Sequence, residues 1–460
     1  MSGFATKPPN ILVQTENNSE PPRLLQKVQD VVSPDRYVVY PIETKQLLNN
    51  PWVKNTRMLI IQSRLELEVL AEVEVYLDSG GKVLDFASNI EKGLSGYVDI
   101  KTGVDTLDTT ELVNILRDDF QIETNAGDDS KISYSHGYLV SNSKVLNLFL
   151  ESKRFIETKT LVQTKISLDF LPNLQPPSKN YLPVKNESPP NFNSSQYLSH
   201  LTTSHLGQPL VFVPTISSSM DPFTGPPIFH GFTVVPQRQL SGQGRGGNKW
   251  LSPPGCSMFS IQIFLKTTSF LGTRPSLIQH LVALAQVHAV RSRVEYRDID
   301  IRLKWPNDVY FGSLVKLGGV IAKGTIVRDD FIVTIGAGLN LNNEHPTRSV
   351  NQVIEESGKD KISQEELIAN TFNVLEDLID KCNDGNFAEV ESLYYKYWLH
   401  GDQKIRIIDK DGDISNNVTV TGIDEFGFLK VVGETGQEFT VFDDGNSFDM
   451  MEGLIRPKTS

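Results

Sequence analysis

The sequence predicts a multidomain protein of the α/β and α+β classes: an N-terminal parallel α/β domain, a central domain with a mixed sheet, and a small C-terminal β-barrel. In the first 165 residues, continuous apolar runs alternate with helical patterns, which is typical of a parallel sheet. A segment rich in Pro, Asn and Ser then precedes a second set of strands and helices. After residue 401 only short strands with Gly, Asp and Asn turns remain.

The N-terminal domain, residues 1–165, is expected to begin with a strand at 10–15 ("NILVQT"). A helix with prolines at its start is expected at 21–32. Apolar strands are then expected at 36–42 and 56–63. A helical pattern follows at 65–81 and ends in two glycines, as helices commonly do.

A linker is expected at residues 166–195, because this segment lacks periodicity and is rich in Pro, Asn and Ser. An ordered but irregular loop is the alternative. The central domain, residues 196–400, contains a helix at 275–290 whose apolar spacing predicts that it is buried. A later helix begins at Ser363, in capping-box spacing with Glu366. The barrel follows at residues 401–460.

The composition favours a globular protein that binds neither nucleic acid nor membrane. Hydrophobic residues make up 39% of the chain, and the net charge of -12 argues against general nucleic-acid binding, which needs a basic surface. The chain has no run of about eighteen apolar residues and no signal-like N-terminal segment. The two cysteines, Cys256 and Cys382, have neither metal-ligand nor disulfide spacing. We therefore expect a cytoplasmic protein.

Four glycines, an arginine, a lysine and a tryptophan occur together in "SGQGRGGNKW", residues 241–250. Glycines let the backbone approach a ligand closely, and their N–H groups can form an anion-binding nest. Arg245 adds a charge that pairs with a carboxylate or phosphate in fork geometry. The loop is not a Walker A motif, and its GxGxxG spacing lies between two strands, unlike a dinucleotide-binding turn. By itself the segment fits a basic structural loop equally well.

Three further stretches place polar groups or glycines at strand ends. "LKWPNDVYF" (303–311) arranges three polar side chains around a turn that a proline fixes. "KLGGVIAK" (316–323) has a lysine before two glycines in a β-rich run, a sign of close approach by a ligand or another backbone. "GAGLNLN" (336–342) ends a strand. Each has a structural alternative: an Asn-Asp turn, an edge-strand lysine beside a bulge, and a glycine turn.

In their order and spacing, the four stretches resemble the biotin protein ligases, also called holocarboxylase synthetases, of the eukaryotic type. The family's glycine-rich loop, roughly GRGRxGxxW, is matched by "GQGRGGNKW", and its KWPND sequence is intact at 304–308. Its K-L-x-G-[IV]-[LI] element is matched at 316–321 and its G-x-G-x-N element at 336–340. The resemblance covers about residues 191–460, and "HGDQKIRI" and "GNSFDMMEGLI" are similar to the eukaryotic branch.

The resemblance implies an ATP-dependent ligase that acts in two steps. The biotin carboxylate attacks the α-phosphate of MgATP to give biotinyl-5'-AMP and pyrophosphate, and a lysine of a carrier domain then takes the biotinyl group and releases AMP. The implied cofactors are ATP and Mg²⁺, with biotin as substrate. The implied partners are biotin carboxyl carrier domains of acetyl-CoA, pyruvate and propionyl-CoA type carboxylases, with no nucleic acid and no membrane. The resemblance assigns no metal ligands.

By the same resemblance, Arg245 and Lys316 supply positive charge where carboxylate and phosphate meet. Asp308 orients the incoming lysine and accepts its proton; a turn-stabilising role is the alternative for this carboxylate. The loop closes over the adenylate to exclude water, and Trp250 covers the adenine. The biotin-binding residues are Ser218, Ser219, Gln239, Gly242, Gly244, Arg245, Lys316, Gly319 and Gly336. The ATP-binding residues are Arg245, Gly246, Asn248, Trp250, Lys304, Asn307, Lys316 and Asn340.

Several positions depart from the family pattern. Gln243, Gly246 and Asn248 stand where bacterial members often have arginines, so this loop carries less charge. Met220 stands where many bacterial members have Asn, which weakens the transfer of that contact. The N-terminal domain resembles, more loosely, a glutamine-amidotransferase-like domain, but residues 1–165 contain no cysteine nucleophile. We therefore expect it to be non-catalytic, with a regulatory or acceptor-recognition role. The C-terminal domain is expected to be an SH3-like β-barrel that helps to hold ATP or the carrier domain.

Two other functions fit parts of the pattern. A lipoate or octanoate transferase shares the fold, but the charged loop and the intact KWPND sequence favour a biotin ligase. A non-catalytic biotin-binding regulator would keep the pocket, but the retention of Lys316 and Asp308 argues against it. A transcriptional repressor would need a DNA-binding domain, and the N-terminal sheet pattern is not helix-turn-helix.

Overall fold

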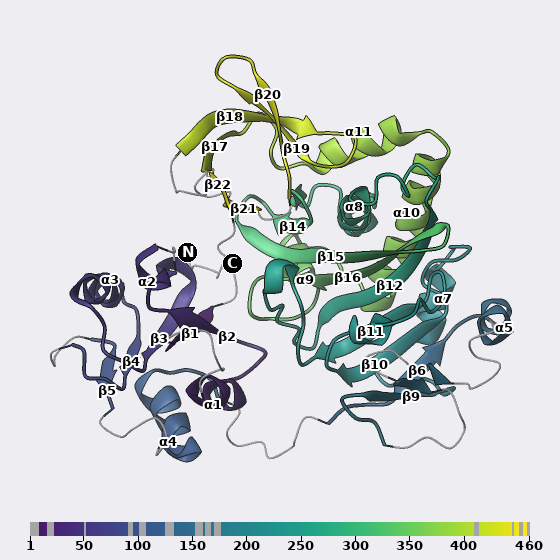
Figure 1. The fold of residues 1–460 in the computed structure, drawn as a ribbon. Coiled ribbons are helices and arrows are strands. Elements are labelled where there is room, and N and C mark those ends of the chain that lie inside the picture. The colour runs from purple at the N-terminus through teal and green to yellow at the C-terminus, as the bar shows by residue number, and fades with distance from the viewer. Residues whose placement is uncertain are drawn as a thin grey trace. The chain divides into compact units, whose positions relative to one another are not determined.

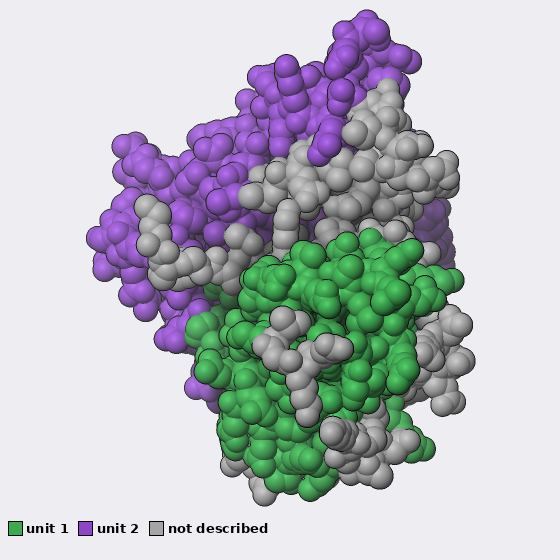
Figure 2. Space-filling view, turned by 90° about the vertical axis from the view of Figure 1, so that its left-hand side faces the viewer, with its two compact units in different colours: residues 1–132, 345–347 green, residues 133–344, 348–460 purple. Residues whose placement is uncertain are grey.

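The chain forms two compact units, residues 1–132 with 345–347 and residues 133–344 with 348–460 (Figure 2). The structure is a computed structural model, and it describes residues 9–15, 23–49, 52–90, 95–100, 107–124, 133–151, 160–161, 167–169, 176–408, 414–443, 446–449 and 454–457.

The first unit is built on a five-stranded sheet with the order β2-β1-β3-β4-β5, in which every strand pair is parallel (Figure 1). Its strands are β1 (Asn10–Thr15), β2 (Val38–Glu43), β3 (Thr56–Ile61), β4 (Val83–Asp85) and β5 (Tyr97–Asp99). Its helices are α1 (Arg23–Val31), α2 (Gln46–Asn49), α3 (Leu67–Asp78) and α4 (Thr109–Asn114), with a 3₁₀ turn at Val53–Asn55 and a π turn at Ile115–Asp119.

Both faces of this sheet are covered by helices. Successive side chains of a strand point to opposite faces. Ile11 and Val13 therefore pack with α1 and α4, whereas Leu12 between them packs with α2 and α3. A strand buried on both sides needs a continuous apolar run, which is what the sequence provides. The expected parallel α/β domain is confirmed.

The division between the units differs from the expected one. We expected the N-terminal domain to extend to residue 165 and a linker to fill 166–195. Instead, β6 (Gly137–Val140) pairs with a central strand of the second unit, and β9 (Tyr181–Lys185) pairs in parallel with β6. Leu182 and Val184 of β9 are buried beside Val211. The prolines around this short strand hid its apolar alternation, and residues 170–175 lie outside the described part.

The second unit contains an eleven-stranded sheet with the order β13-β14-β15-β16-β12-β11-β10-β6-β9-β8-β7. It includes both parallel and antiparallel pairs, as the sequence predicted for the central domain. Its further strands are β7 (Thr160–Leu161), β8 (Ser167–Asp169), β10 (Leu210–Ile216), β11 (Thr233–Gln239), β12 (Cys256–Lys266), β13 (Ile301–Lys304), β14 (Asp308–Phe311), β15 (Val315–Val327) and β16 (Asp330–Asn340). Its helices are α5 (Ser143–Glu151), α7 (Ser194–His200), α8 (Leu277–Arg291), α9 (Val350–Glu356), α10 (Gln364–Asn383) and α11 (Phe387–Tyr397).

The two faces of β12, β15 and β16 differ in character. Ile335, Ala337 and Leu339 of β16 pack into the core beneath α8 and α10 (Figure 1). The residues between them, Gly336 and Gly338, therefore face the other way. The alternation gives the sheet one apolar face covered by helices and one face with little side-chain bulk, on which a cavity can form.

The helices confirm the expected local signals, with one exception. Helix α8 is buried along nearly its whole length, as its apolar spacing on both sides predicted. The side chain of Ser363 caps α10 by accepting from the N–H of Glu366. The reciprocal half of the capping box is replaced, because the Glu366 carboxylate pairs with Arg293 instead.

The C-terminal sheet has the order β20-β19-β18-β17-β22-β21. Its neighbouring strands are antiparallel except for the parallel pair β17–β22. The strands are β17 (Lys404–Ile408), β18 (Ile414–Ile423), β19 (Leu429–Gly433), β20 (Glu438–Val441), β21 (Asn446–Asp449) and β22 (Leu454–Pro457). In the described ranges, none of the helices is both long and apolar enough to cross a membrane.

Two histidines are buried where this sheet meets the core. The Nε2 atom of His400 accepts the backbone N–H of Trp305 at 3.0 Å, and its Nδ1 faces Gln403 Oε1 at 2.9 Å. His280 contacts the Tyr394 hydroxyl at 3.1 Å. Burial is the main cause that lowers the pKa of each imidazole to about 4. Both rings are therefore neutral at physiological pH.

We expect the free energy of unfolding to fall as the pH falls from about 6.5 to 4. The unfolded chain protonates these histidines with a pKa of about 6.5, while the folded chain resists protonation until about pH 4. Each of the two histidines therefore lowers the free energy of unfolding by about 1.4 kcal/mol for every pH unit of acidification within that window. Urea unfolding at pH 7, 6 and 5 measures the slope. His400→Gln should lower it by one histidine's share, and His200→Gln, at a partly buried position, serves as control. An equal slope in wild type and His400→Gln would contradict the assignment.

Candidate active site

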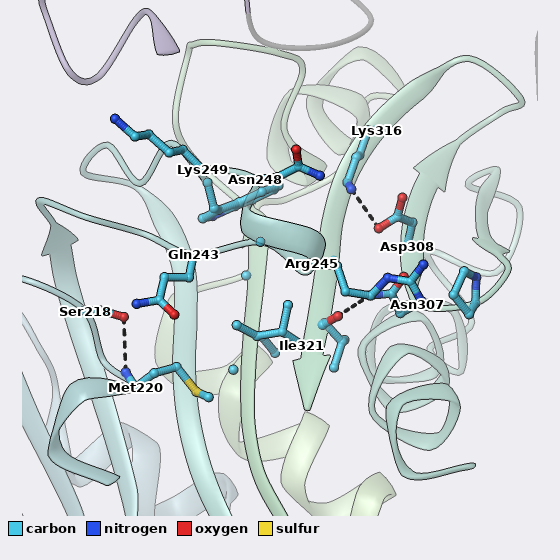
Figure 3. Close-up of a pocket in the computed structure, with 18 of the residues that line it drawn as sticks. Ser218, Met220, Gln243, Arg245, Asn248, Lys249, Asn307, Asp308, Lys316 and Ile321 are labelled. Atoms are coloured by element: carbon cyan, nitrogen blue, oxygen red, sulfur yellow. Dashed lines mark hydrogen bonds and ion pairs between the residues drawn. The ribbon is translucent and has the colours of Figure 1, made fainter. Parts of the chain in front are cut away.

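A cavity of about 210 Å³ opens on the glycine-bearing face of the central sheet (Figure 3). It is lined by strand residues, by the segment after β10, by the loop between β11 and β12, and by the turn between β13 and β14. The lining residues are Ser218, Ser219, Met220, Gln239, Gln243, Gly244, Arg245, Asn248, Lys249, Trp250, Lys304, Trp305, Pro306, Asn307, Asp308, Lys316, Gly319, Val320, Ile321, Gly336, Ala337 and Gly338.

Among the residues whose surroundings the structure describes, it brings the predicted site residues into this one cavity, with the exception of Gly242 and Asn340. The surroundings of Gly246 lie outside the described part. Asn340 is buried at the end of β16, where its Oδ1 accepts from Cys256 Sγ at 3.4 Å and Asn343 Nδ2 at 3.1 Å. Its amide therefore ties two segments of the fold together away from the cavity. The family resemblance that implied a nucleotide contact for Asn340 does not reveal this engagement.

The glycine-rich loop is a narrow hairpin. The N–H of Trp250 donates to Gly242 O at 2.9 Å, and the N–H of Gly244 donates to Asn248 O at 2.7 Å. A side chain at Gly242 would lie 2.3 Å from the Trp250 carbonyl oxygen, so this glycine permits the hairpin to close and does not line the cavity. A 3₁₀ turn at Arg245–Gly247 forms the tip and carries the arginine.

A lysine and an aspartate form an ion pair on one wall of the cavity. Lys316 Nζ lies 2.7 Å from Asp308 Oδ1, and the two side chains are 27% and 18% exposed (Figure 3). Burial by itself would raise the pKa of Asp308, but the charges of Lys316, Lys304 and Arg245 together outweigh it, and the pKa lies below its usual range. Asp308 is therefore ionised at neutral pH.

The turn that carries Asp308 is held from several sides. The N–H of Val320 donates to Asn307 O at 3.0 Å, and the Asn307 side-chain amide donates back to Val320 O. The indole N–H of Trp305 donates to Gly427 O at 3.0 Å. The turn is thus fixed to β15 through Asn307 and to the C-terminal sheet through Trp305.

A buried polar network forms the opposite end of the cavity. The N–H and hydroxyl of Ser219 donate to Gln239 Oε1 at 2.7 and 3.0 Å. Gln239 Nε2 donates to Ser252 Oγ at 3.0 Å, and Ser219 Oγ lies 2.7 Å from Ser260 Oγ. Because each polar group here has a partner, the amide of Gln239 is held in one orientation.

Sequence reasoning did not assign several lining residues to the site. Met220 was treated only as a departure from a family pattern, yet a side chain at Gly336 would lie 3.0 Å from its sulfur. Gly338 faces Trp250, and its position two residues after Gly336 on the same strand was an available signal. Lys249 also lines the cavity, and partial burial lowers its pKa. Ile321 and Trp305 are apolar residues, and the sequence does not show whether an apolar side chain faces a cavity or the core.

Two plant proteins are similar to the chain over most of their own length. A family model described as the biotin/lipoate A/B protein ligase family matches residues 227–340. Biotin–protein ligase 2 of Arabidopsis thaliana is 32% identical over 334 residues, which cover 68% of this chain and 98% of that protein. The chloroplastic biotin–protein ligase 1 of the same plant is 34% identical over 309 residues, which cover 64% of this chain and 80% of that protein.

The human biotin–protein ligase is 40% identical over 277 residues, which cover 58% of this chain. That match spans 38% of the human protein, so the chain corresponds to well under half of that relative. Among solved structures, the biotin protein ligase from Aquifex aeolicus in complex with biotin and ATP is 23% identical, with a TM-score of 0.40. The match covers 51% of this chain and 95% of that one.

We expect Gly338→Ala to displace the indole of Trp250. A side chain at residue 338 would lie 2.8 Å from Trp250 Nε1 and 3.1 Å from Cε2, closer than packed atoms allow. The emission of Trp250, obtained by subtracting the spectrum of the matching Trp250→Phe protein, should shift to the red. Gly401→Ala is the control, because its new methyl group would meet Trp398 at an ordinary 3.9 Å. An unchanged Trp250 emission in Gly338→Ala would show that the indole does not pack here.

Proposed function

Because the chain belongs to the biotin–protein ligase family, we propose that it activates biotin with ATP as biotinyl-5'-AMP. We propose further that it transfers the biotinyl group to a lysine of a biotin-dependent carboxylase carrier domain. The observation that carries this proposal is the meeting of Arg245, Lys316 and Asp308 in one cavity, with a polar network at its other end.

Positive charge is what the first step requires. The carboxylate oxygen of biotin forms a bond to the α-phosphorus of ATP while the bond to the bridging oxygen of pyrophosphate breaks. Two anions must approach, and negative charge builds on the phosphoryl oxygens. Arg245 and Lys316 supply fixed cations at this point, and a partly buried site makes each charge count for more than it does in water. In this role the ammonium of Lys316 shares its contact between Asp308 and the substrate oxygens.

The polar network suits the neutral end of biotin. A ureido ring needs a few placed donors and acceptors, and its apolar rings and tail need apolar walls. Ser219 and Gln239 supply the polar groups, while Met220, Ile321 and Gly336 supply an apolar wall with little bulk. Trp250 closes the side formed by the loop. Its buried indole N–H has no partner among the described residues, so it suits an acceptor on the nucleotide.

Asp308 serves the second step. The nitrogen of the acceptor lysine attacks the acyl carbon, the acyl–oxygen bond to the phosphate breaks, and AMP leaves with the electron pair. A lysine amine is mostly protonated at neutral pH, with a pKa of about 10.4, so it must lose protons to react. A carboxylate that stays ionised binds the incoming ammonium and takes a proton during attack. Lys316 Nζ lies beside this carboxylate and marks where a second amino group fits.

Magnesium enters as part of the MgATP substrate. Among the described residues, no group of three or more His, Cys, Asp or Glu side chains is placed to hold a metal, and Asp308 is the one carboxylate in the cavity lining. A single carboxylate suits a magnesium ion that would take most of its ligands from water and from the phosphate oxygens of ATP. The chain itself supplies nitrogen cations and hydrogen-bond donors, which contact the phosphate oxygens that the ion leaves exposed.

Three further assignments complete the proposal. The parallel sheet of the first unit suits an amidotransferase-like domain without catalysis, since both cysteines lie in the second unit. The C-terminal sheet suits an SH3-like barrel that buttresses the nucleotide side of the cavity. A cytoplasmic location agrees with two buried cysteines that are reduced thiols.

The central test is transfer of biotin to an apo carrier domain in the presence of MgATP, followed by mass spectrometry. We expect a mass increase equal to one biotinyl group that requires ATP. Lys316→Ala should slow it about a hundredfold or more, because the phosphoryl charge loses its main partner. Lipoate in excess serves as the competitor. A mass increase equal to one lipoyl group would show that the protein transfers a different acyl substrate. Tight biotin binding without transfer would show that the protein binds biotin but is not a ligase.

Asp308→Asn should affect the two steps unequally. We expect transfer from preformed biotinyl-5'-AMP to fall about a hundredfold, since no carboxylate accepts the lysine proton. Biotin-dependent exchange of pyrophosphate into ATP should change by less than about fivefold, because Lys316 and Arg245 are retained. Single-turnover assays of each step measure the difference. If both steps fell by the same factor, Asp308 would be a structural residue of the turn.

A further inference from the structure

The guanidinium of Arg245 is held by a residue far away in the sequence. Its Nη1 lies 2.7 Å from Asp443 Oδ2, and its Nη2 donates to the backbone oxygen of Asp443 at 3.2 Å. Asp443 follows strand β20, so the contact joins the glycine-rich loop to the C-terminal sheet. Both side chains are largely covered, with 27% and 18% of their surface exposed.

Asp443 is itself fixed from the core. Gln279 on helix α8 donates from Nε2 to the same carboxylate oxygen at 2.9 Å. The carboxylate thus lies between a buried helix and the glycine-rich hairpin. The glycines give the backbone of such a hairpin more conformational freedom than a helix has. Because Gln279 holds the Asp443 carboxylate from the helix, that carboxylate can restrict the movement of the Arg245 side chain.

The C-terminal sheet cannot shift easily relative to this helix. The turn after β18 contacts the start of α8, where Arg274 pairs with Glu425 at 2.6 Å and Ser276 Oγ donates to Phe426 O. A side chain at Gly427 would lie 2.6 Å from His280 Nε2, which shows how closely the turn approaches the helix. Asp443 is therefore presented to Arg245 from a docked sheet.

The contact leaves the arginine able to bind an anion. A guanidinium has five N–H donors, and in the described chain the contacts with Asp443 use two of them. Arg245 reaches toward Asn307 and Asp308 in the cavity (Figure 3). A long side chain on a loop otherwise loses rotamer freedom when it binds, and this loss has an entropic cost. Holding one edge of the fork in advance removes part of that cost.

We propose that Asp443 is a positioning residue, contributed by the C-terminal sheet, that fixes Arg245 for its contact with the substrate anions. The proposal rests on the proposed function for the identity of those anions. The placement of the loop by Asp443 is independent of that function. Gln279 supports the same arrangement from α8.

The loop placement is tested on the ligand-free protein by limited trypsin digestion, because Arg245 and Lys249 are cleavage sites within the hairpin. We expect Asp443→Ala to speed cleavage after Arg245 at least threefold. Asp443→Asn should lie between it and wild type, because the amide oxygen still accepts from Arg245. Glu425→Ala is the matched control, since it removes an ion pair between the same helix region and the same sheet without touching the loop. The Ser276–Phe426 hydrogen bond and the contact between Gly427 and His280 still dock the turn in this variant. Equal cleavage rates in all four proteins would overturn the proposal.

The functional consequence is tested by the kinetics of biotin-dependent pyrophosphate exchange. We expect Asp443→Ala to lower kcat/KM for biotin and for ATP about tenfold, Asp443→Asn less, and Glu425→Ala not at all. Melting temperatures confirm that each variant is folded. Faster turnover or tighter substrate binding in Asp443→Ala would overturn the proposal, because Asp443 would then compete with the substrates for Arg245. A wild-type protein that transfers no biotin would overturn the proposed function, while the digestion result would still decide the role of Asp443.

Discussion

The pairing of β16 with β12 and β15 is the constraint on which the site depends. Its register places Gly336 opposite Ser260 and Ile321, and Gly338 opposite Met258 and Gly319. Because side chains alternate, this register puts the large apolar residues under α8 and α10 and leaves small residues on the cavity face. A slip of one residue would place those apolar side chains in the cavity. The space for a substrate is therefore a direct consequence of strand pairing.

The charge of the cavity is opposite to that of the chain. The chain carries a net charge of -12, yet among the described lining residues four are cationic and one, Asp308, is acidic. The cations also hold Asp308 in its ionised form against the effect of burial. The same cations suit an anionic substrate, and they keep Asp308 in the ionised state that the proposed proton transfer requires. Total charge predicted that nucleic acid is not a partner, but it did not predict this local field.

The C-terminal sheet and a residue just before it support the site through three contacts with different chemistry. Gly427 accepts the indole N–H of Trp305, and Asp443 holds the guanidinium of Arg245. His400, just before the sheet, accepts the backbone N–H of Trp305 and can do so only while its imidazole is neutral. The turn and the loop that carry the charged groups are thus supported by a separate part of the chain. This arrangement explains why a cavity formed on one face of a sheet can hold long side chains in place.

The sequence by itself determined β1, β2, β3, α1 and α3 of the first unit, the buried helix α8, and the residue types gathered at the cavity, because periodicity and turn residues act locally. It missed β6 and β9, because both strands are short and the apolar residues of β9 lie among prolines, so that pairing with neighbours defines them. Tertiary structure alone decided that Asn340 is engaged with Cys256 and that Arg245 meets Asp443. Such contacts join residues far apart in the chain, and side-chain packing, which no local pattern encodes, selects them.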